Sequence, residues 1–119
     1  GIYPMERVEK LPDVTRRRWF RRGTGGNAGL VRVSPQLQEV ITFQQLNLLH
    51  NWSFPQRFDI IFCRNVVIYF DKETQVTLFE KYANQLVEHG HLFIGHSESL
   101  FQKTSRFKLI GKTVYQKTS

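Results

Sequence analysis

The stretch FDIIFCRNVVIYFD, residues 58–71, holds the side chains that are best suited to chemistry. It begins as an apolar run of strand formers, turns polar at Arg64 and Asn65, and resumes with apolar residues that carry one hydroxyl, that of Tyr69. Ligands of open α/β sheets sit outside the carboxyl ends of the strands. We therefore predict a ligand-binding edge here, although Arg64 and Asn65 also suit a plain strand-end turn and Tyr69 also suits a core aromatic.

A second polar cluster, GHSES at 95–99, follows another predicted strand. It resembles the nucleophile elbow G-x-S-x-G of hydrolases, but Ser99 replaces the last glycine and the chain is too short for that fold. A hydrolase is therefore disfavoured. Asn47, in the QLNLL segment before residue 58, could reach the same edge as Arg64.

The histidines and the lone cysteine give weaker signals. His89, His91 and His96 lie close in sequence, but no Cys or carboxylate stands at ligand spacing with them, so we predict no metal site. Cys63 is interpreted as a small buried hydrophobe, and a thiol nucleophile is the disfavoured alternative.

The first part of the chain predicts a helix and a small β-hairpin. A helix is expected over 12–20, the glycines of RGTGGN then favour a turn, and two strands at 29–33 and 37–43 are predicted to pair across Ser34-Pro35-Gln36. The net charge of +7 is concentrated here, since residues 1–33 carry eight Lys or Arg against three acids. The centre of this basic segment, RRRWFRR at 16–22, suits a solvated helix face, an acidic protein partner or nucleic acid.

The second part predicts parallel strands joined by a helix. FDIIFC at 58–63 has the pattern of a strand buried on both faces, which is typical of parallel sheets. Asp71 is expected to cap a helix that continues to Gly90, after which HLFIG at 91–95 forms the second strand. This α/β unit leaves an open edge beside 58–63, so the sequence looks like the back half of a domain.

A last hairpin is predicted over 106–110 and 113–117, across Gly111-Lys112. No glycine-rich loop opens a helix, and no acidic ribose-binding residue follows a strand, so a complete nucleotide fingerprint is missing.

Taken together, FCRNVVIYFDKETQ, GHLFIGHSES, FKLIGKTVYQK and RRGTGGNAGLVRV resemble the carboxy-terminal part of the CheR-type chemotaxis methyltransferases. The resemblance implies methyl transfer from S-adenosylmethionine to chemoreceptor glutamates, with S-adenosylhomocysteine as the product. It also implies the carboxy-terminal half of a Rossmann-like class I methyltransferase sheet, over 47–119, and a small inserted antiparallel β-subdomain with linker helices, over 1–46. Asn47, Leu48, Arg64 and Asn65 fall at cofactor-binding positions, and Tyr69 falls beside the transferred methyl group. In this setting His96, Ser97 and Glu98 are expected to shape the rim of the methyl-transfer pocket or to cap a following turn.

The same resemblance implies a chemoreceptor cytoplasmic domain or tail as the partner, without nucleic acid. Short apolar runs, an amino terminus without a signal pattern and an unpaired cysteine predict a cytoplasmic protein without membrane insertion. The predicted open sheet edge would be covered by dimerisation or by a swapped chain. The alternative function is a non-catalytic docking module that uses the basic segment and the β-hairpin.

Overall fold

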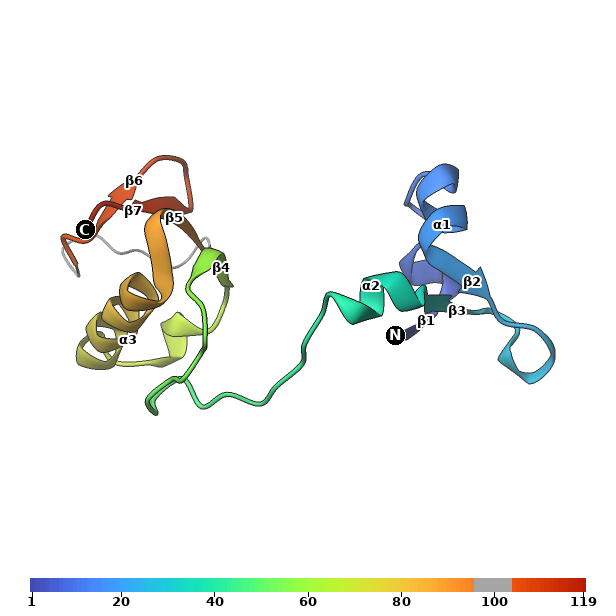
Figure 1. Cartoon of the computed structure of the whole chain (residues 1–119), viewed down its shortest axis with the longest axis horizontal. Helices are drawn as coiled ribbons and strands as arrows, with labels where there is room; N and C mark the ends of the chain where they lie inside the picture. Colours follow the sequence, from blue (N-terminus) through green and yellow to red (C-terminus); the bar gives the residue numbers. More distant parts are fainter. Residues whose placement is uncertain (96–103) are drawn as a thin grey trace. The chain divides into compact units, whose positions relative to one another are not determined.

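Two compact units, Gly1–Gln45 and Leu46–Ser119, make up the chain (Figure 1). The computed structural model describes residues 1–95 and 104–119. Each unit has its own β-sheet.

The first unit is built on a three-stranded antiparallel sheet with strand order β1-β3-β2. Its strands are β1 (Ile2–Pro4), β2 (Phe20–Arg22) and the central β3 (Leu30–Val33). Two short 3-10 turns, η1 (Met5–Arg7) and η2 (Gly25–Asn27), and the helix α1 (Asp13–Trp19) lie between the strands. The predicted helix over 12–20 is therefore confirmed, and it leads directly into β2.

The predicted hairpin over 29–43 is wrong in its second half. The first of its two strands exists as β3, but the residues that follow form the short helix α2 (Pro35–Glu39) and then an extended segment outside any sheet. Pro35 occupies the first turn of α2, where its fixed φ favours a helix and its missing N–H is no loss. The strands that pair with β3 are β1 and β2 instead.

The second unit contains a mixed four-stranded sheet with strand order β4-β5-β7-β6. Its strands are β4 (Phe58–Cys63), β5 (Leu86–Ile94), β6 (Phe107–Leu109) and β7 (Val114–Lys117). β4 and β5 are parallel, and the helix α3 (Lys72–Gln85) connects them, so the predicted βαβ unit is confirmed. β6 and β7 form the predicted antiparallel hairpin across Gly111-Lys112.

The helix α3 begins as predicted but ends earlier. The Asp71 carboxylate accepts a hydrogen bond from the backbone N–H of Thr74 at 2.8 Å, which is the expected cap. Instead of continuing to Gly90, the chain leaves the helix after Gln85, because Leu86 already pairs with Phe58 of β4. The register between these strands then shifts.

Gly90 has a different role from the predicted helix stop. It is buried within β5, and a Cβ at this position would lie 2.9 Å from the Val87 carbonyl oxygen and 3.2 Å from that of Asp59. The close approach of these two carbonyl oxygens, Val87 first, therefore favours glycine here.

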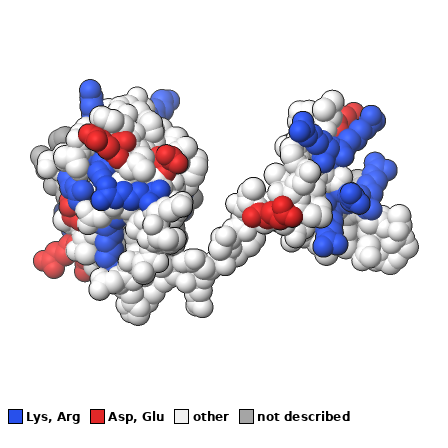
Figure 2. Space-filling view, in the orientation of Figure 1, with Lys and Arg blue, Asp and Glu red and all other residues white. Residues whose placement is uncertain are grey.

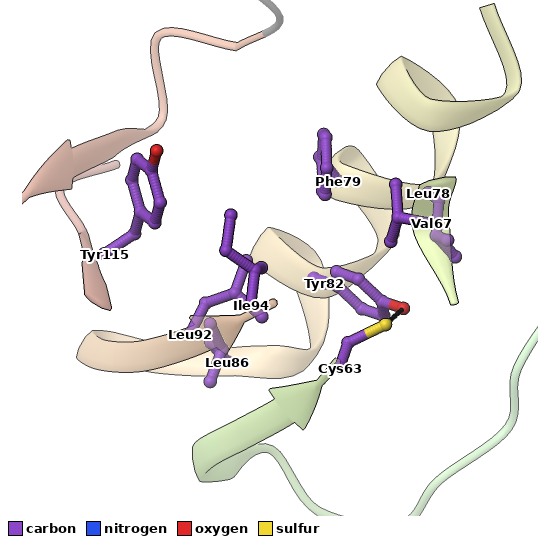
Figure 3. Packing of buried hydrophobic residues seen from close by; sticks show 9 residues of the cluster. All are labelled: Cys63, Val67, Leu78, Phe79, Tyr82, Leu86, Leu92, Ile94 and Tyr115. Carbon is purple, nitrogen blue, oxygen red and sulfur yellow. Dashed lines mark hydrogen bonds between the residues drawn. The ribbon is translucent and has the colours of Figure 1, made fainter. Parts of the chain in front are cut away.

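The core of the second unit lies between α3 and the sheet (Figure 3). Phe79, Tyr82 and Ala83 of α3 are buried as their spacing predicts, whereas Val76 is exposed. The buried cluster consists of Cys63, Val67, Leu78, Phe79, Tyr82, Leu86, Leu92, Ile94 and Tyr115. Cys63 is buried, as its interpretation as a small hydrophobe requires, and its sulfur accepts a hydrogen bond from the Tyr82 hydroxyl at 2.7 Å.

Only one face of β4 packs against this core. Cys63 is buried, but Ile60 and Phe62 are 49% and 68% exposed, so the predicted burial on both faces is wrong for this chain. β4 is an edge strand, and among the described residues no strand pairs with its outer side. The predicted open edge is thus confirmed.

Candidate functional site

Arg64 and Asn65 lie directly after the last residue of β4, at the carboxyl end of the parallel unit. Both side chains are exposed. Asn65 has a φ of 60°, in the left-handed region that Asn tolerates better than most residues. The chain bends here and presents two polar side chains at the strand end where α/β sheets bind ligands.

Tyr69 follows in the 3-10 turn η3 (Val67–Tyr69), and its side chain is 79% exposed. Gln75 of α3 holds this turn in place. Its side-chain amide donates hydrogen bonds to the carbonyl oxygens of Val67 at 2.9 Å and Phe70 at 3.0 Å. Val67 is itself buried in the core. Tyr69 is thus an exposed phenol on a well-supported turn.

Asn47 and Leu48 lie in the segment that precedes β4. The Asn47 side-chain oxygen accepts a hydrogen bond from the Leu49 N–H at 3.0 Å, which closes a local turn. The Lys81 ammonium of α3 donates to the carbonyl oxygens of Leu48 at 3.2 Å and His50 at 2.8 Å. This cation fastens the Leu48 segment to the same helix that supports the Tyr69 turn.

A cavity of about 350 Å³ in the second unit is lined both by the segment around Leu48 and by the carboxyl end of β4. Leu48 and Arg64 both line it, so the structure brings two of the five predicted site residues together. Asn47, Asn65 and Tyr69 lie outside its lining. Most of the wall is apolar or aromatic and includes Trp52, Phe54, Phe58, Phe62 and Tyr82.

Trp52 carries an unsatisfied polar atom at this cavity. Its indole Nε1 is buried and has no hydrogen-bond partner among the described residues. Its ring packs against Tyr82, with 5.4 Å between ring centroids, and Lys81 lies 5.8 Å from its centroid. Because a buried unpaired N–H is costly, this donor fits a ligand that brings an acceptor into the cavity.

The second predicted polar cluster lies mostly outside the described residues. β5 ends at Ile94, and Gly95 is described and buried, but His96, Ser97 and Glu98 are not among the described residues. The described part of the chain contains no group of three or more His, Cys, Asp or Glu side chains that could hold a metal ion.

Two ionisable groups beside the parallel unit have shifted pKa values. The hydrogen bonds from Thr74 lower the pKa of Asp71 at the start of α3. Burial lowers the pKa of Lys117 in β7, and the positive charges of Arg57 and Arg106 act in the same direction. The Lys117 ammonium donates to the Leu86 carbonyl oxygen at 2.9 Å, at the junction of α3 and β5.

Three residues that support the site were not predicted from the sequence: Gln75, Lys81 and Trp52. The first two act from a helix on segments that precede it in the chain, and pattern analysis of a helix does not reveal such contacts. Trp52 stands in a segment without periodicity, and its place beside Tyr82 depends on the fold.

The parallel βαβ unit gives the second unit an α/β fold, with polar residues at a strand end and an adjoining aromatic cavity. The chain belongs to the CheR methyltransferase family, whose SAM binding domain matches residues 1–116. This match confirms the resemblance that the motifs carry, and it makes S-adenosylmethionine the cofactor of the family.

Several curated relatives agree with this family. The chain is 46% identical to chemotaxis protein methyltransferase 2 of Pseudomonas aeruginosa over 97% of its length, which is 41% of that relative. It is 47% identical to the chemotaxis protein methyltransferase of Klebsiella aerogenes and 45% identical to that of Escherichia coli, covering 40% and 41% of them. The chain therefore spans about two fifths of the length of these relatives. No helix in its described part has the length and apolar character needed to cross a membrane.

Proposed function

We propose that this chain forms part of an enzyme that transfers a methyl group from S-adenosylmethionine to glutamate side chains of chemoreceptors. The observation that carries the proposal is the family match along residues 1–116, together with relatives named as chemotaxis protein methyltransferases. The glutamate substrate and the chemoreceptor partner rest on the resemblance of the motifs.

The proposed cofactor site uses both segments that converge on α3. Arg64 and Asn65 would bind the cofactor from the end of β4, and Asn47 and Leu48 would bind it from the preceding segment. The shared lining of the cavity by Leu48 and Arg64 supports this arrangement. So does the exposure of Asn47 and Asn65, which leaves both accessible to a ligand.

The chemistry of the cavity fits one part of S-adenosylmethionine. Its aromatic walls suit a flat adenine ring, and the unpaired indole N–H of Trp52 offers a donor for a ring nitrogen. The residues present thus match an adenosyl group better than a phosphate-bearing nucleotide, which would need several donors or cations in the cavity.

The proposed reaction requires alignment more than proton transfer. When bound, S-adenosylmethionine supplies a methyl group activated by its sulfonium charge. A glutamate carboxylate is already ionised near neutral pH and needs no general base. Tyr69, held by the Gln75-supported turn, would orient the reacting carboxylate through its hydroxyl, and the apolar wall would exclude water.

The sheet of the second unit is proposed to be the carboxy-terminal half of a Rossmann-like sheet. The free edge of β4 is suited to pairing with further strands, and the exposed Ile60 and Phe62 on its outer face are suited to cover by helices. Because the chain spans about two fifths of its relatives, the preceding part of a longer polypeptide is the occupant we propose for this edge. In this arrangement residues 1–46 form a β-subdomain inserted into that longer enzyme.

A second function, protein docking without chemistry, is favoured by the charge of the first unit. Its Lys and Arg side chains dominate one face (Figure 2), and residues 1–33 carry eight such residues. β2, which includes Arg21 and Arg22, is an edge strand of the small sheet and could pair with a receptor segment. In the enzyme, the same surface would hold the chemoreceptor.

Titration of S-adenosylmethionine into this chain and into the longer protein separates the two functions. We expect binding by the longer protein, and Asn65→Ala should weaken it roughly 5- to 150-fold, which corresponds to about 1–3 kcal/mol for an unpaired polar group. Asn51→Ala is the matched control, because Asn51 is also an exposed amide but does not lie at the carboxyl end of a strand. Absence of binding by the longer protein would favour the docking module.

A further inference from the structure

A cavity of about 600 Å³ lies within the first unit, over one face of its three-stranded sheet. Arg22 of β2 and Val31 of β3 are register partners, and both line the cavity together with Phe20. The helix α1 and the turn after β1 complete the wall with Asp13, Arg16, Arg17, Met5 and Val8. This volume is in the range of small-molecule sites.

The charges around this cavity are unbalanced. Arg16, Arg17 and Arg22 contribute three guanidinium groups, and Asp13 contributes the one carboxylate of the lining. Asp13 accepts a hydrogen bond from Arg16. Two positive charges therefore stay uncompensated within the lining, and a phosphate monoester carries nearly that charge near neutral pH.

Arg16 also has a donor that the described residues do not use. Its Nε is buried and has no hydrogen-bond partner among them. Guanidinium groups bind phosphate through paired N–H donors, and such charge-assisted bonds are about twice as strong as neutral ones. A phosphate oxygen in the cavity would supply the missing acceptor.

The floor of the cavity is apolar. Val8 and Val31 are buried, Phe20 and Met5 are half-buried, and all four line the cavity together with the arginines. An inorganic ion would leave the accessible parts of Met5 and Phe20 in contact with water. A ligand with a hydrophobic or aromatic group would cover this apolar part of the lining, which favours its binding.

We propose that this cavity is a binding site for a small organic phosphate, a phosphate monoester attached to an apolar or aromatic group. The site is distinct from the proposed S-adenosylmethionine site, which lies in the other unit, and it does not depend on methyl transfer. Binding would place a ligand beside β2, so the occupant could regulate what docks on that edge strand.

Phenyl phosphate is the probe for a test on the intact chain, because it has the proposed chemistry and no likeness to the cofactor. We expect it to shift the methyl signals of Val8 and Val31 in NMR spectra, and calorimetry should show tighter binding than for inorganic phosphate or benzoate. Inorganic phosphate lacks the ring, and benzoate lacks the second charge.

Two variants of neighbouring arginines locate the site. Arg22→Gln should weaken phenyl phosphate binding roughly tenfold or more, because it removes a charge-assisted hydrogen bond to the phosphate. Arg21→Gln removes the same charge from the same strand, but Arg21 pairs with Arg32 and lies outside the cavity lining, so binding should change less than about twofold. Arg17→Gln, on α1, gives a second lining variant that does not alter the sheet.

Several outcomes would overturn the proposal. One is the absence of shifts at Val8 and Val31, and another is an equal loss for Arg21→Gln and Arg22→Gln, which would show diffuse charge attraction. Equal affinity for inorganic phosphate and phenyl phosphate would show that the apolar group of the ligand does not contribute to binding. Tighter binding of an acidic peptide such as tetraglutamate, with displacement of phenyl phosphate, would make this surface a peptide-docking face.

Discussion

Gln75 should hold the Tyr69 turn in place, and Gln75→Ala tests this directly. The substitution removes two side-chain hydrogen bonds, to the carbonyl oxygens of Val67 and Phe70, and each contributes about 0.5–1.5 kcal/mol to stability. The Val67 oxygen keeps its bond from the Phe70 N–H, so the full cost of an unpaired buried acceptor does not arise there.

Two smaller terms act in opposite directions. Loss of a buried methylene costs about 0.8 kcal/mol, while release of the ordered glutamine side chain returns up to about 1.5–2 kcal/mol. Taken at the middle of these ranges, the net destabilisation expected for Gln75→Ala is about 2 kcal/mol. That is a large share of the 5–15 kcal/mol that is typical of a folded domain.

Urea unfolding followed by Trp52 fluorescence measures this loss within the second unit. Trp19 is replaced by Phe in all samples, so that Trp52 is the only tryptophan. Hydrogen exchange at the Phe70 amide, which donates to Val67, reports on the turn itself. We expect this amide to exchange faster in Gln75→Ala.

Gln85→Ala is the matched control on the same helix. The Gln85 amide donates to the Gln56 carbonyl oxygen at 2.6 Å, but in an exposed position where water can replace it. Its cost should stay below about 1 kcal/mol. Equal costs for the two variants, or wild-type exchange at Phe70 in Gln75→Ala, would refute the role of Gln75.

Two further predictions concern pH. The folded pKa of Asp71 is lowered, so its contribution to stability is present above the ordinary value of 3.8 and is lost as the pH falls through the folded value. Asp71→Asn should therefore lose less stability at acidic pH, which melting temperatures measured across that range would show. A pH profile equal to that of the wild-type protein would contradict this role of Asp71. The folded pKa of Lys117 is also lowered, so the unfolded chain binds the proton more tightly and stability rises with pH between the folded value and 10.5. Lys117→Met should abolish that rise in urea midpoints recorded up to pH 10.5, whereas the same slope in both proteins would show that the burial of Lys117 has no effect.

The parts of the fold that the sequence predicted well depend on local signals. The Asp71 cap and the Gly111-Lys112 turn each depend on residues that are close in sequence, so both can be predicted from the sequence alone. The end of α3 could not be predicted in this way, because the pairing of Leu86 with Phe58 joins residues far apart in sequence. Residues 37–43 alternate as a strand would, but among the described residues no strand pairs with them, and Pro35 starts a helix.

The candidate site shows the same division. Arg64 and Asn65 were predicted at a strand end, and the structure places them there. This prediction was possible because the apolar pattern of residues 58–63 indicates a strand without information from the rest of the chain. The cavity and the supporting contacts of Gln75, Lys81 and Trp52 were not foreseen. Each joins α3 to a segment from another part of the chain, and such contacts follow from packing instead of from spacing.

The role of Tyr69 is the part of the proposed mechanism that a single substitution tests most sharply. Tyr69→Phe keeps the ring, and the hydroxyl is exposed, so stability and cofactor affinity should change little. If the hydroxyl acts mainly in the transition state, the turnover number falls while binding is retained. Tyr3→Phe, an exposed tyrosine of the first unit, is the matched control.

The decisive measurement is the single-turnover rate of isotopic methyl transfer from S-adenosylmethionine to glutamate side chains of a chemoreceptor cytoplasmic domain, by the longer protein. We expect base-labile glutamyl methyl esters with the wild-type and Tyr3→Phe proteins. For Tyr69→Phe we expect the rate to fall roughly tenfold or more, at unchanged cofactor affinity. A tenfold fall corresponds to an increase of about 1.4 kcal/mol in the barrier. Absence of glutamyl esters with the wild-type protein would contradict the proposed function, and a wild-type rate for Tyr69→Phe would contradict the proposed role of Tyr69.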